Sequence, residues 1–176
     1  MQTDYTTMAP IHQGTRTEKG VKTNVLRLLA SRRVPHQAFT YSEEIHSAEG
    51  AAQAIGAPVE QVYKTLVVLR ERGRPMLVIV PGGHQVDLRR LARSLGEKKL
   101  HMATQRQAEQ MTGLQVGGIS ALALLNRGFD VYIDTSASRW QAIYVSAGQR
   151  GLNVRLAVAD LVRLTGARPV EAIEES

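Results

Sequence analysis

A single lysine interrupts an otherwise apolar stretch of the sequence. Residues 62–69 read Val-Tyr-Lys-Thr-Leu-Val-Val-Leu, a composition that predicts a buried strand. Because side chains alternate across a strand, Lys64 shares its face with Val62, Leu66 and Val68. A buried ammonium without a partner is costly. Two interpretations remain open: Lys64 extends its ammonium to water near the strand end, or it points into a cleft to meet an anionic group such as a phosphate.

Two glycine-containing segments could present backbone groups to a ligand. The first is Gly117-Gly118-Ile119-Ser120, which either forms a tight turn or exposes N–H groups to an oxygen, as oxyanion sites do. The second spans residues 146–151 and reads Ser-Ala-Gly-Gln-Arg-Gly. It either holds a phosphate or simply reverses the chain.

Other polar residues allow both a structural and a chemical interpretation. Asp134 ends an expected strand, where a carboxylate commonly caps a turn but could also pair with a substrate amino group. Tyr41 and His46 are packing or capping groups, or they contact a ligand. The sequence has no phosphate-binding loop, dinucleotide fingerprint, zincin motif or nucleophile elbow. We expect neither a cofactor nor a metal, since none of the five histidines has metal-ligand spacing: His12, His36, His46, His84 and His101.

Composition places the chain among globular proteins. Its 176 residues are 43% hydrophobic and 22% charged, which suits one domain. No cysteine is present, so disulfides and a cysteine nucleophile of the protein itself are excluded. No apolar run reaches the roughly 18–20 residues of a membrane helix, and we expect a cytoplasmic protein without a membrane partner. The net charge of +6 fits a polyanion partner, although many soluble proteins are equally basic.

The order of the expected elements predicts a single α+β domain. Residues 1–20 are polar and aperiodic and indicate a flexible tail, whereas residues 21–174 form the folded part. Residues 62–80 indicate a hairpin, so we expect a mixed, mostly antiparallel sheet wrapped by helices. The expected helices are 21–33, 48–55, 88–95, 105–112 and 160–165, and the expected strands are 36–41, 62–69, 76–80, 100–103, 130–134, 142–146 and 152–158.

Four segments taken in order carry a resemblance to a known family. They are residues 63–68, Tyr-Lys-Thr-Leu-Val-Val; residues 117–120, Gly-Gly-Ile-Ser; residues 132–134, Tyr-Ile-Asp; and residues 145–152, Val-Ser-Ala-Gly-Gln-Arg-Gly-Leu. Together they resemble the YbaK and prolyl-tRNA-synthetase-associated editing family, over roughly residues 21–173. The resemblance implies that Lys64 is the essential catalytic residue. It also implies a substrate pocket formed by Tyr41, His46, Gly117, Gly118, Ile119, Ser120, Asp134, Ser146 and Gly148.

The resemblance further implies a trans-editing deacylase that hydrolyses the ester of mischarged tRNA. The expected substrate is Cys-tRNA(Pro), or another small amino acid on tRNA(Pro), cleaved without a metal and with help from the substrate itself. The expected partners are the 3′-terminal adenosine and acceptor stem of that tRNA, and a prolyl-tRNA synthetase. The basic helix 88–95 either touches the acceptor stem or forms a solvated face.

One departure from the family pattern leaves a second function open. The family loop usually continues Gly-Gly-Ile-Ser-Pro, and this chain has Ala121 in place of the proline. A proline would restrict one backbone dihedral. The alternative function is therefore a non-catalytic module of the same fold that binds a nucleotide or an aminoacyl-tRNA.

Overall fold

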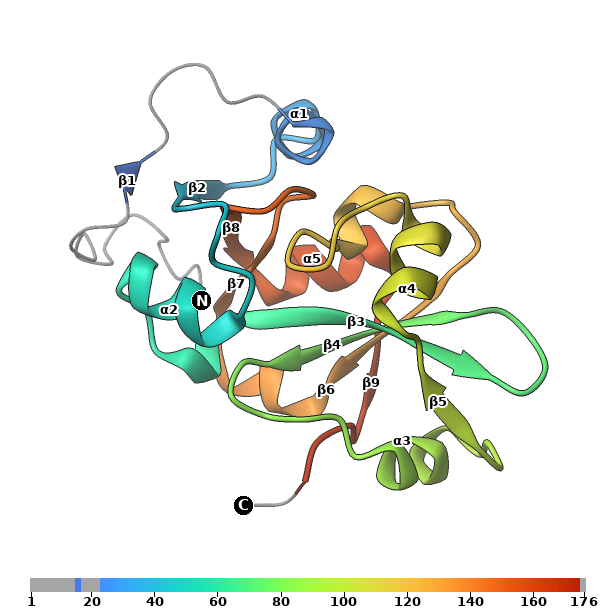
Figure 1. Ribbon diagram of the computed structural model, residues 1–176. Coiled ribbons are helices and arrows are strands. Elements are labelled where there is room, and N and C mark those ends of the chain that lie inside the picture. Colours follow the sequence, from blue (N-terminus) through green and yellow to red (C-terminus); the bar gives the residue numbers. More distant parts are fainter. Residues whose placement is uncertain (1–14, 17–22, 175–176) are drawn as a thin grey trace.

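The strands of the protein form two sheets that are joined at one point (Figure 1). The computed structural model describes residues 15–16 and 23–174 of the 176. The four-stranded sheet is antiparallel and has the order β1 (Thr15–Arg16), β2 (His36–Thr40), β8 (Leu152–Ala157) and β7 (Ala142–Ser146). The five-stranded sheet is mixed and has the order β5 (Leu100–Met102), β3 (Tyr63–Arg70), β4 (Met76–Pro81), β6 (Asp130–Asp134) and β9 (Arg168–Val170).

Most helices begin at a residue whose side chain caps them. Thr23, Ser47, Asp87 and Thr104 each accept a hydrogen bond from a backbone N–H of the first turn, which satisfies a donor that has no partner within the helix. The α-helices are α1 (Asn24–Ser31), α2 (Ala48–Ile55), α3 (Leu88–Leu95), α4 (Gln105–Thr112) and α5 (Val158–Thr165). Short 3-10 helices are η2 (Val59–Gln61), η3 (Ala121–Leu124) and η4 (Thr135–Arg139). No helix in the described residues has the length and apolarity needed to cross a membrane.

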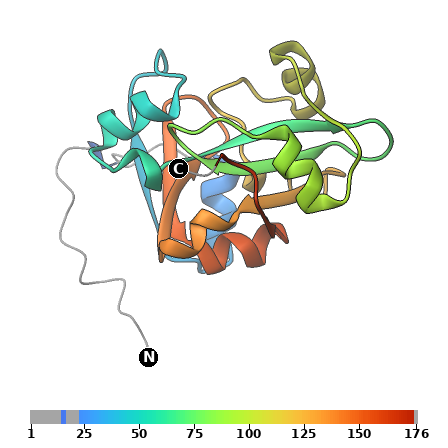
Figure 2. The same ribbon diagram turned by 90° about the horizontal axis from the view of Figure 1, so that it is seen from below.

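Strand β4 separates two hydrophobic clusters by alternation of its side chains. Leu77 and Ile79 join the larger cluster, which both sheets share with α1, α4 and α5. Met76, Val78 and Val80 join a second cluster that α3 covers. Helices α3 and α4 therefore lie on opposite faces of the five-stranded sheet, as Figures 1 and 2 also show.

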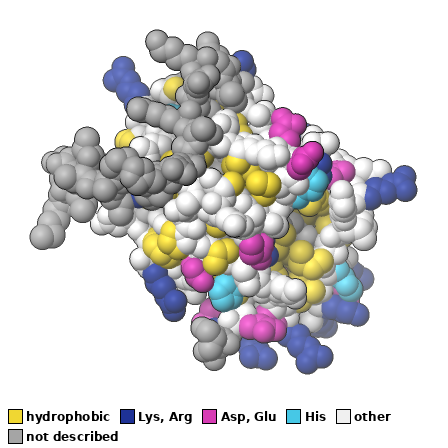
Figure 3. Space-filling model, turned by 60° about the vertical axis from the view of Figure 1, so that its left-hand side comes forward, with side chains coloured by type: hydrophobic (Ala, Val, Ile, Leu, Met, Phe, Trp, Pro, Cys, Tyr) yellow, Lys and Arg dark blue, Asp and Glu magenta, His cyan; other side chains and the backbone are white. Residues whose placement is uncertain are grey.

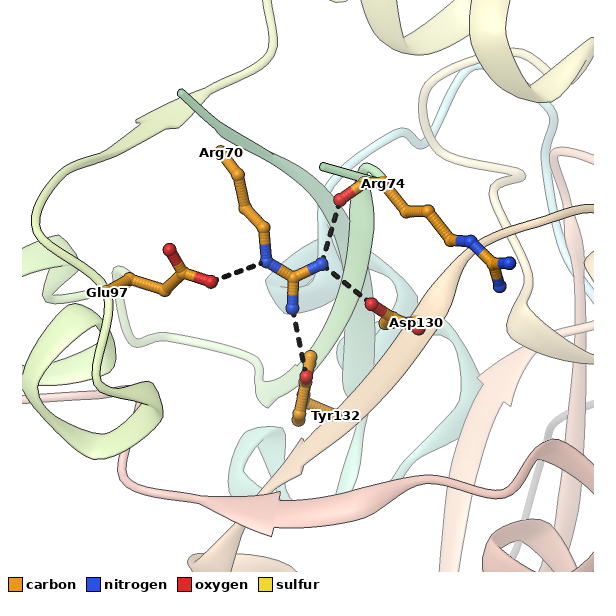
Figure 4. A network of polar contacts seen from close by, with 5 residues as sticks. All are labelled: Arg70, Arg74, Glu97, Asp130 and Tyr132. Atoms are coloured by element: carbon orange, nitrogen blue, oxygen red, sulfur yellow. Dashed lines mark hydrogen bonds and ion pairs between the residues drawn. The ribbon is translucent and has the colours of Figure 1, made fainter. Parts of the chain in front are cut away.

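An arginine at the end of β3 joins three elements through a polar network (Figure 4). Arg70 donates from Nε to Glu97 at 2.8 Å, from Nη1 to Asp130 at 2.7 Å, and from Nη2 to the Tyr132 hydroxyl at 3.0 Å. Its Nη1 also reaches the Arg74 carbonyl oxygen at 2.9 Å. Because the guanidinium has a partner on each nitrogen, this cation is structural.

The expected α+β fold is confirmed, with its strands divided between two sheets rather than one. The expected tail, residues 1–20, lies outside the described residues except for β1, which pairs with β2. Helix α5 begins two residues before the expected start at 160, with Ala157 as its N-cap. Strand β9 and helix η3 were not predicted, because three or four residues carry too little periodicity to reveal them.

Candidate active site

A cavity of about 370 Å³ opens beside strand β3, where the strand lacks a neighbour. On this side β5 pairs only with Val68, Leu69 and Arg70, and Val62 bridges Tyr144 of the other sheet. Between these points residues 64–66 pair with β4 on one edge, and no described strand pairs with them on the other edge. The cavity therefore occupies the gap between the two sheets. Its walls come from β3, the segments before and within α2, α4 and the glycine loop: Tyr41, His46, Ser47, Ala48, Glu49, Ala51, Val62, Tyr63, Lys64, Thr65, Leu66, Val67, Met102, Ala103, Gln105, Ala108, Val116, Gly117, Ile119, Ser146 and Asn153.

Lys64 lies in the wall of this cavity and is partly buried. Among residues 15–16 and 23–174, no hydrogen bond or ion pair satisfies its ammonium. Arg70 lies six positions further along the same strand and differs from Lys64 in this respect, because each of its guanidinium nitrogens has a hydrogen-bond partner. A cation held without a counter-charge at a cavity wall is suited to receive an anionic or strongly polar ligand atom.

The neighbouring Thr65 also lines the cavity, with a residue exposure of only 8%. No hydrogen bond of its hydroxyl is found in the described part of the chain. The Val67 carbonyl oxygen accepts a hydrogen bond from the Ala103 N–H on the edge of β3 that faces the cavity. In a strand, the backbone groups of alternate residues point to the same edge. The N–H and C=O of Thr65 therefore face the cavity too. The sequence analysis did not single out Thr65. No sequence signal marks it, because its surroundings depend on which edge of β3 lacks a strand partner.

The two loop glycines differ in what their backbone groups can do. Gly117 lines the cavity with a φ of +94°, a conformation that favours glycine. Gly118 is buried, and its N–H donates to the Gln115 carbonyl at 2.8 Å, so this amide is not free to bind a substrate oxygen. Ile119 reaches the cavity, whereas Ser120 is 1% exposed and its hydroxyl has no partner in the described residues.

Tyr41 closes another part of the cavity wall. Its hydroxyl donates to Asn153 at 3.0 Å, and burial raises the pKa of Tyr41 to about 12. His46 and Ser146 line the same cavity, and the Ser146 hydroxyl accepts a hydrogen bond from the Gly148 N–H at 3.3 Å. Six expected site residues thus surround one cavity: Lys64, Tyr41, His46, Gly117, Ile119 and Ser146.

Asp134 is not brought together with these residues. Its carboxylate is 3% exposed and accepts from the N–H groups of Ser136 and Ala172, both at 2.9 Å. It lines a second, polar cavity of about 940 Å³ instead. Gly118, Ser120 and Gly148 also lie outside the lining of the first cavity. Of the two interpretations of Asp134, these contacts match the capping one, because both carboxylate oxygens accept hydrogen bonds from backbone amides.

Basic residues are not concentrated around the cavity. The exposed Arg89 and Arg93 lie on α3, across the sheet from α4, and Arg90 pairs with Glu171 at 3.3 Å. On the face drawn in Figure 3, Lys and Arg side chains lie mainly around the outline. In the described ranges, no group of three or more His, Asp or Glu side chains could hold a metal ion.

Comparisons with known proteins identify the family of the chain. The family profile of the aminoacyl-tRNA editing domain matches residues 42–164. The chain is 34% identical over 152 residues to EbsC of Enterococcus faecalis, described as a candidate Cys-tRNA(Pro)/Cys-tRNA(Cys) deacylase, covering 85% of this chain and 92% of that protein.

Solved structures share the fold. The crystal structure of a candidate trans-editing enzyme for prolyl tRNA synthetase superposes with a TM-score of 0.74 at 26% identity, over 89% of this chain and 100% of that one. The hypothetical protein APE2540 superposes with a TM-score of 0.77 at 21% identity, over 85% and 99%. Sequence profile, relative and fold agree, and the chain belongs to the aminoacyl-tRNA editing domain family.

Proposed function

We propose that the protein is a trans-editing deacylase that hydrolyses the ester bond of mischarged tRNA, with Cys-tRNA(Pro) as the expected substrate. Membership of the editing-domain family supports the class of reaction. The name of the Enterococcus faecalis relative supports the choice of cysteine and of tRNA(Pro). Such an enzyme acts in the cytoplasm, where aminoacyl-tRNAs are used, and a prolyl-tRNA synthetase is the protein partner that fits this substrate.

The observation that carries the proposal is the ammonium of Lys64 in the cavity wall, which has no partner in the part of the chain that the structure describes. The 3′ end of an aminoacyl-tRNA offers phosphate and ribose oxygens that such a cation can hold. The charge stays fixed while the ester reacts, so its role is to position and stabilise. A volume of about 370 Å³ accommodates an aminoacyl group.

The ester carbonyl would be oriented by two neutral donors that line the same cavity as the lysine. Gly117 is the loop glycine whose N–H has no bond within the described residues, and the Thr65 hydroxyl is equally free. Water bonds to the carbonyl carbon, the ester C–O bond breaks, and the ribose oxygen leaves as a hydroxyl after gaining a proton. For a cysteinyl substrate, its own thiol sulfur takes the place of water: the C–S bond forms as the ester C–O bond breaks, and the thiol proton passes to the ribose oxygen. Water then opens the resulting cyclic thioester to give free cysteine.

Selectivity in this scheme depends on size. Small wrong amino acids enter the cavity, whereas the larger correct one is excluded, as in a second sieve. The cavity lining includes the apolar side chains of Leu66, Met102 and Ile119, which can contact a small side chain but offer it no charge. The set of small amino acids that the protein releases measures this selectivity directly.

A panel of misacylated tRNAs tests the proposal. Wild-type protein should release cysteine from tRNA(Pro), and Lys64→Ala should abolish release while its circular dichroism spectrum is unchanged. Lys99→Ala is the matched control, because Lys99 is exposed and lies outside the cavity lining. Release should also weaken as salt rises, because a cation that holds a phosphate is screened. Full activity of Lys64→Ala on every tRNA would refute the mechanism.

The same panel separates an enzyme from a binding module. Binding of aminoacyl-tRNA without release of any amino acid would identify a non-catalytic module. In that case Lys64→Ala should still weaken binding, since the ammonium contacts the ligand under either function.

A further inference from the structure

The peptide groups of Val116 are held from two sides, directly before the cavity glycine. The Val116 N–H donates to Oε1 of Glu109 on α4 at 3.1 Å. The Val116 carbonyl accepts from Nε of Arg150 at 2.7 Å. These partners are separated from Val116 by 7 and 34 positions in sequence, so the loop joins α4 to the turn between β7 and β8.

The next residues of the loop pack against the same turn. A methyl group on Gly118 would lie 2.8 Å from the backbone nitrogen of Arg150 and 2.8 Å from the carbonyl carbon of Gln149. The two glycine segments therefore touch backbone to backbone. Any displacement of Arg150 is transmitted to the loop, because densely packed backbones leave no gap to absorb it.

The Arg150 side chain points to a carbonyl of its own chain. Its Nε donates a hydrogen bond to the Val116 carbonyl. This favours the interpretation that residues 146–151 reverse the chain over the one in which they bind a phosphate. The pKa of Glu109 is lowered by its hydrogen bonds from Val116 and Gln105 and by the nearby charge of Arg150, while burial opposes this with a smaller effect. Glu109 is therefore ionised at neutral pH. An anion and a cation thus hold the same residue on its N–H and C=O sides.

We infer that Glu109 and Arg150 are positioning residues that fix the Gly117 amide at the cavity by clamping Val116 from both sides. The inference rests on the proposed function, which assigns the Gly117 N–H to the ester carbonyl. Neither side chain lines the cavity, so neither contacts the substrate. Their effect reaches the reaction only through the loop.

Three variants test the clamp. Glu109→Ala removes the acceptor of the Val116 N–H, whereas Glu109→Gln keeps an oxygen at the same place without the charge. Arg150→Met removes the donor to the Val116 carbonyl and keeps an unbranched side chain. Gln110→Ala is the matched control, because Gln110 is exposed on the same helix and its side chain makes no hydrogen bond in the described residues.

Amide hydrogen exchange measures the loop without reference to activity. In Glu109→Ala and Arg150→Met we expect exchange of residues 116–120 to accelerate about fivefold or more, the change expected from losing one such hydrogen bond. Glu109→Gln and Gln110→Ala should match wild type. Unchanged exchange in Glu109→Ala would overturn the inference, and so would equal acceleration in Glu109→Gln. If Arg150→Met does not fold, the two Glu109 variants decide the result.

Kinetics add a readout that a purely structural role would not change. Glu109→Ala should lower kcat for deacylation about tenfold with KM nearly unchanged, because a displaced amide weakens binding of the transition state rather than of the substrate. A rise in KM alone would overturn the positioning role. If wild type releases no amino acid from any tRNA, the proposed function fails, and hydrogen exchange still decides whether the clamp exists.

Discussion

The two cations of β3 should separate stability from activity. Lys64→Met should abolish deacylation and leave the fold intact, whereas Arg70→Met should weaken the fold and leave deacylation intact. Both changes replace a long cation with an unbranched apolar side chain in the same strand. The difference between them is therefore the set of partners each cation has.

The expected cost of Arg70→Met follows from its network. The guanidinium donates four hydrogen bonds, two of them to the carboxylates of Glu97 and Asp130. Hydrogen bonds to charged groups contribute about 1.5–3 kcal/mol each when buried. The two carboxylates are 30% and 31% exposed and can regain water, so we expect a net loss of about 2 kcal/mol in the free energy of unfolding.

The expected cost of Lys64→Met is near zero. No partner in the described residues loses a bond when the ammonium is removed, and the new side chain keeps most of the apolar stem in the cavity wall. We expect a change in the free energy of unfolding within about 1 kcal/mol of zero. The deacylation rate should fall by about a hundredfold or more, the usual effect of removing an electrostatic group from a reaction centre.

Urea unfolding and single-turnover deacylation at 25 °C measure both quantities on the same preparations. The assignment of roles is supported if Arg70→Met loses only stability and Lys64→Met loses only activity. The reasoning fails if Lys64→Met is destabilised as much as Arg70→Met, because the lysine would then have a structural partner. It also fails if Lys64→Met retains the wild-type rate.

Four further predictions concern residues in or around the site. Tyr144→Phe should raise the free energy of unfolding by about 1 kcal/mol in urea titrations, because the Tyr144 hydroxyl is buried without a partner in the described residues. Gly118→Ala should cost about 1–3 kcal/mol in the same assay, because its methyl group would lie 2.8 Å from the Arg150 backbone nitrogen. Gly117→Ala, at a φ of +94°, should cost about 1–2 kcal/mol through backbone strain alone; no loss in either variant would contradict the loop geometry. Burial raises the pKa of Tyr41 from 10.0 to about 12, so its contribution to stability is complete below pH 10 and is lost as pH rises toward 12. Denaturation followed from pH 8 to 12 should show this loss in wild type and a smaller one in Tyr41→Phe.

The sequence was most informative where a feature depends on neighbouring residues. The caps at Ser47, Asp87 and Thr104 and the glycines that end those helices gave the bounds of α2, α3 and α4. Capping is a contact within one turn, so residue types three positions apart are sufficient to predict it. The alternation that predicted β3 and β4 is equally local.

Within the site, the structure places the predicted lysine at a cavity and some of its predicted neighbours outside that cavity. An ammonium among aliphatic residues is visible in eight residues of sequence, and the structure places Lys64 at a cavity. Asp134 was grouped with it through the family resemblance, yet its carboxylate caps backbone amides beside a different cavity. Thr65 was overlooked because its environment depends on which edge of β3 lacks a partner.

The residue order by itself determined the domain class, the bounds of α2, α3 and α4 and the presence of one cation in an apolar strand, because each follows from short-range periodicity and composition. Only the tertiary structure decided that Lys64 has no ion-pair partner within residues 15–16 and 23–174, that the Gly118 amide is already bonded, and that Arg150 holds Val116. These facts depend on contacts between segments tens of residues apart. Their geometry arises when the two sheets pack together and leave residues 64–66 of β3 without a strand partner on one edge.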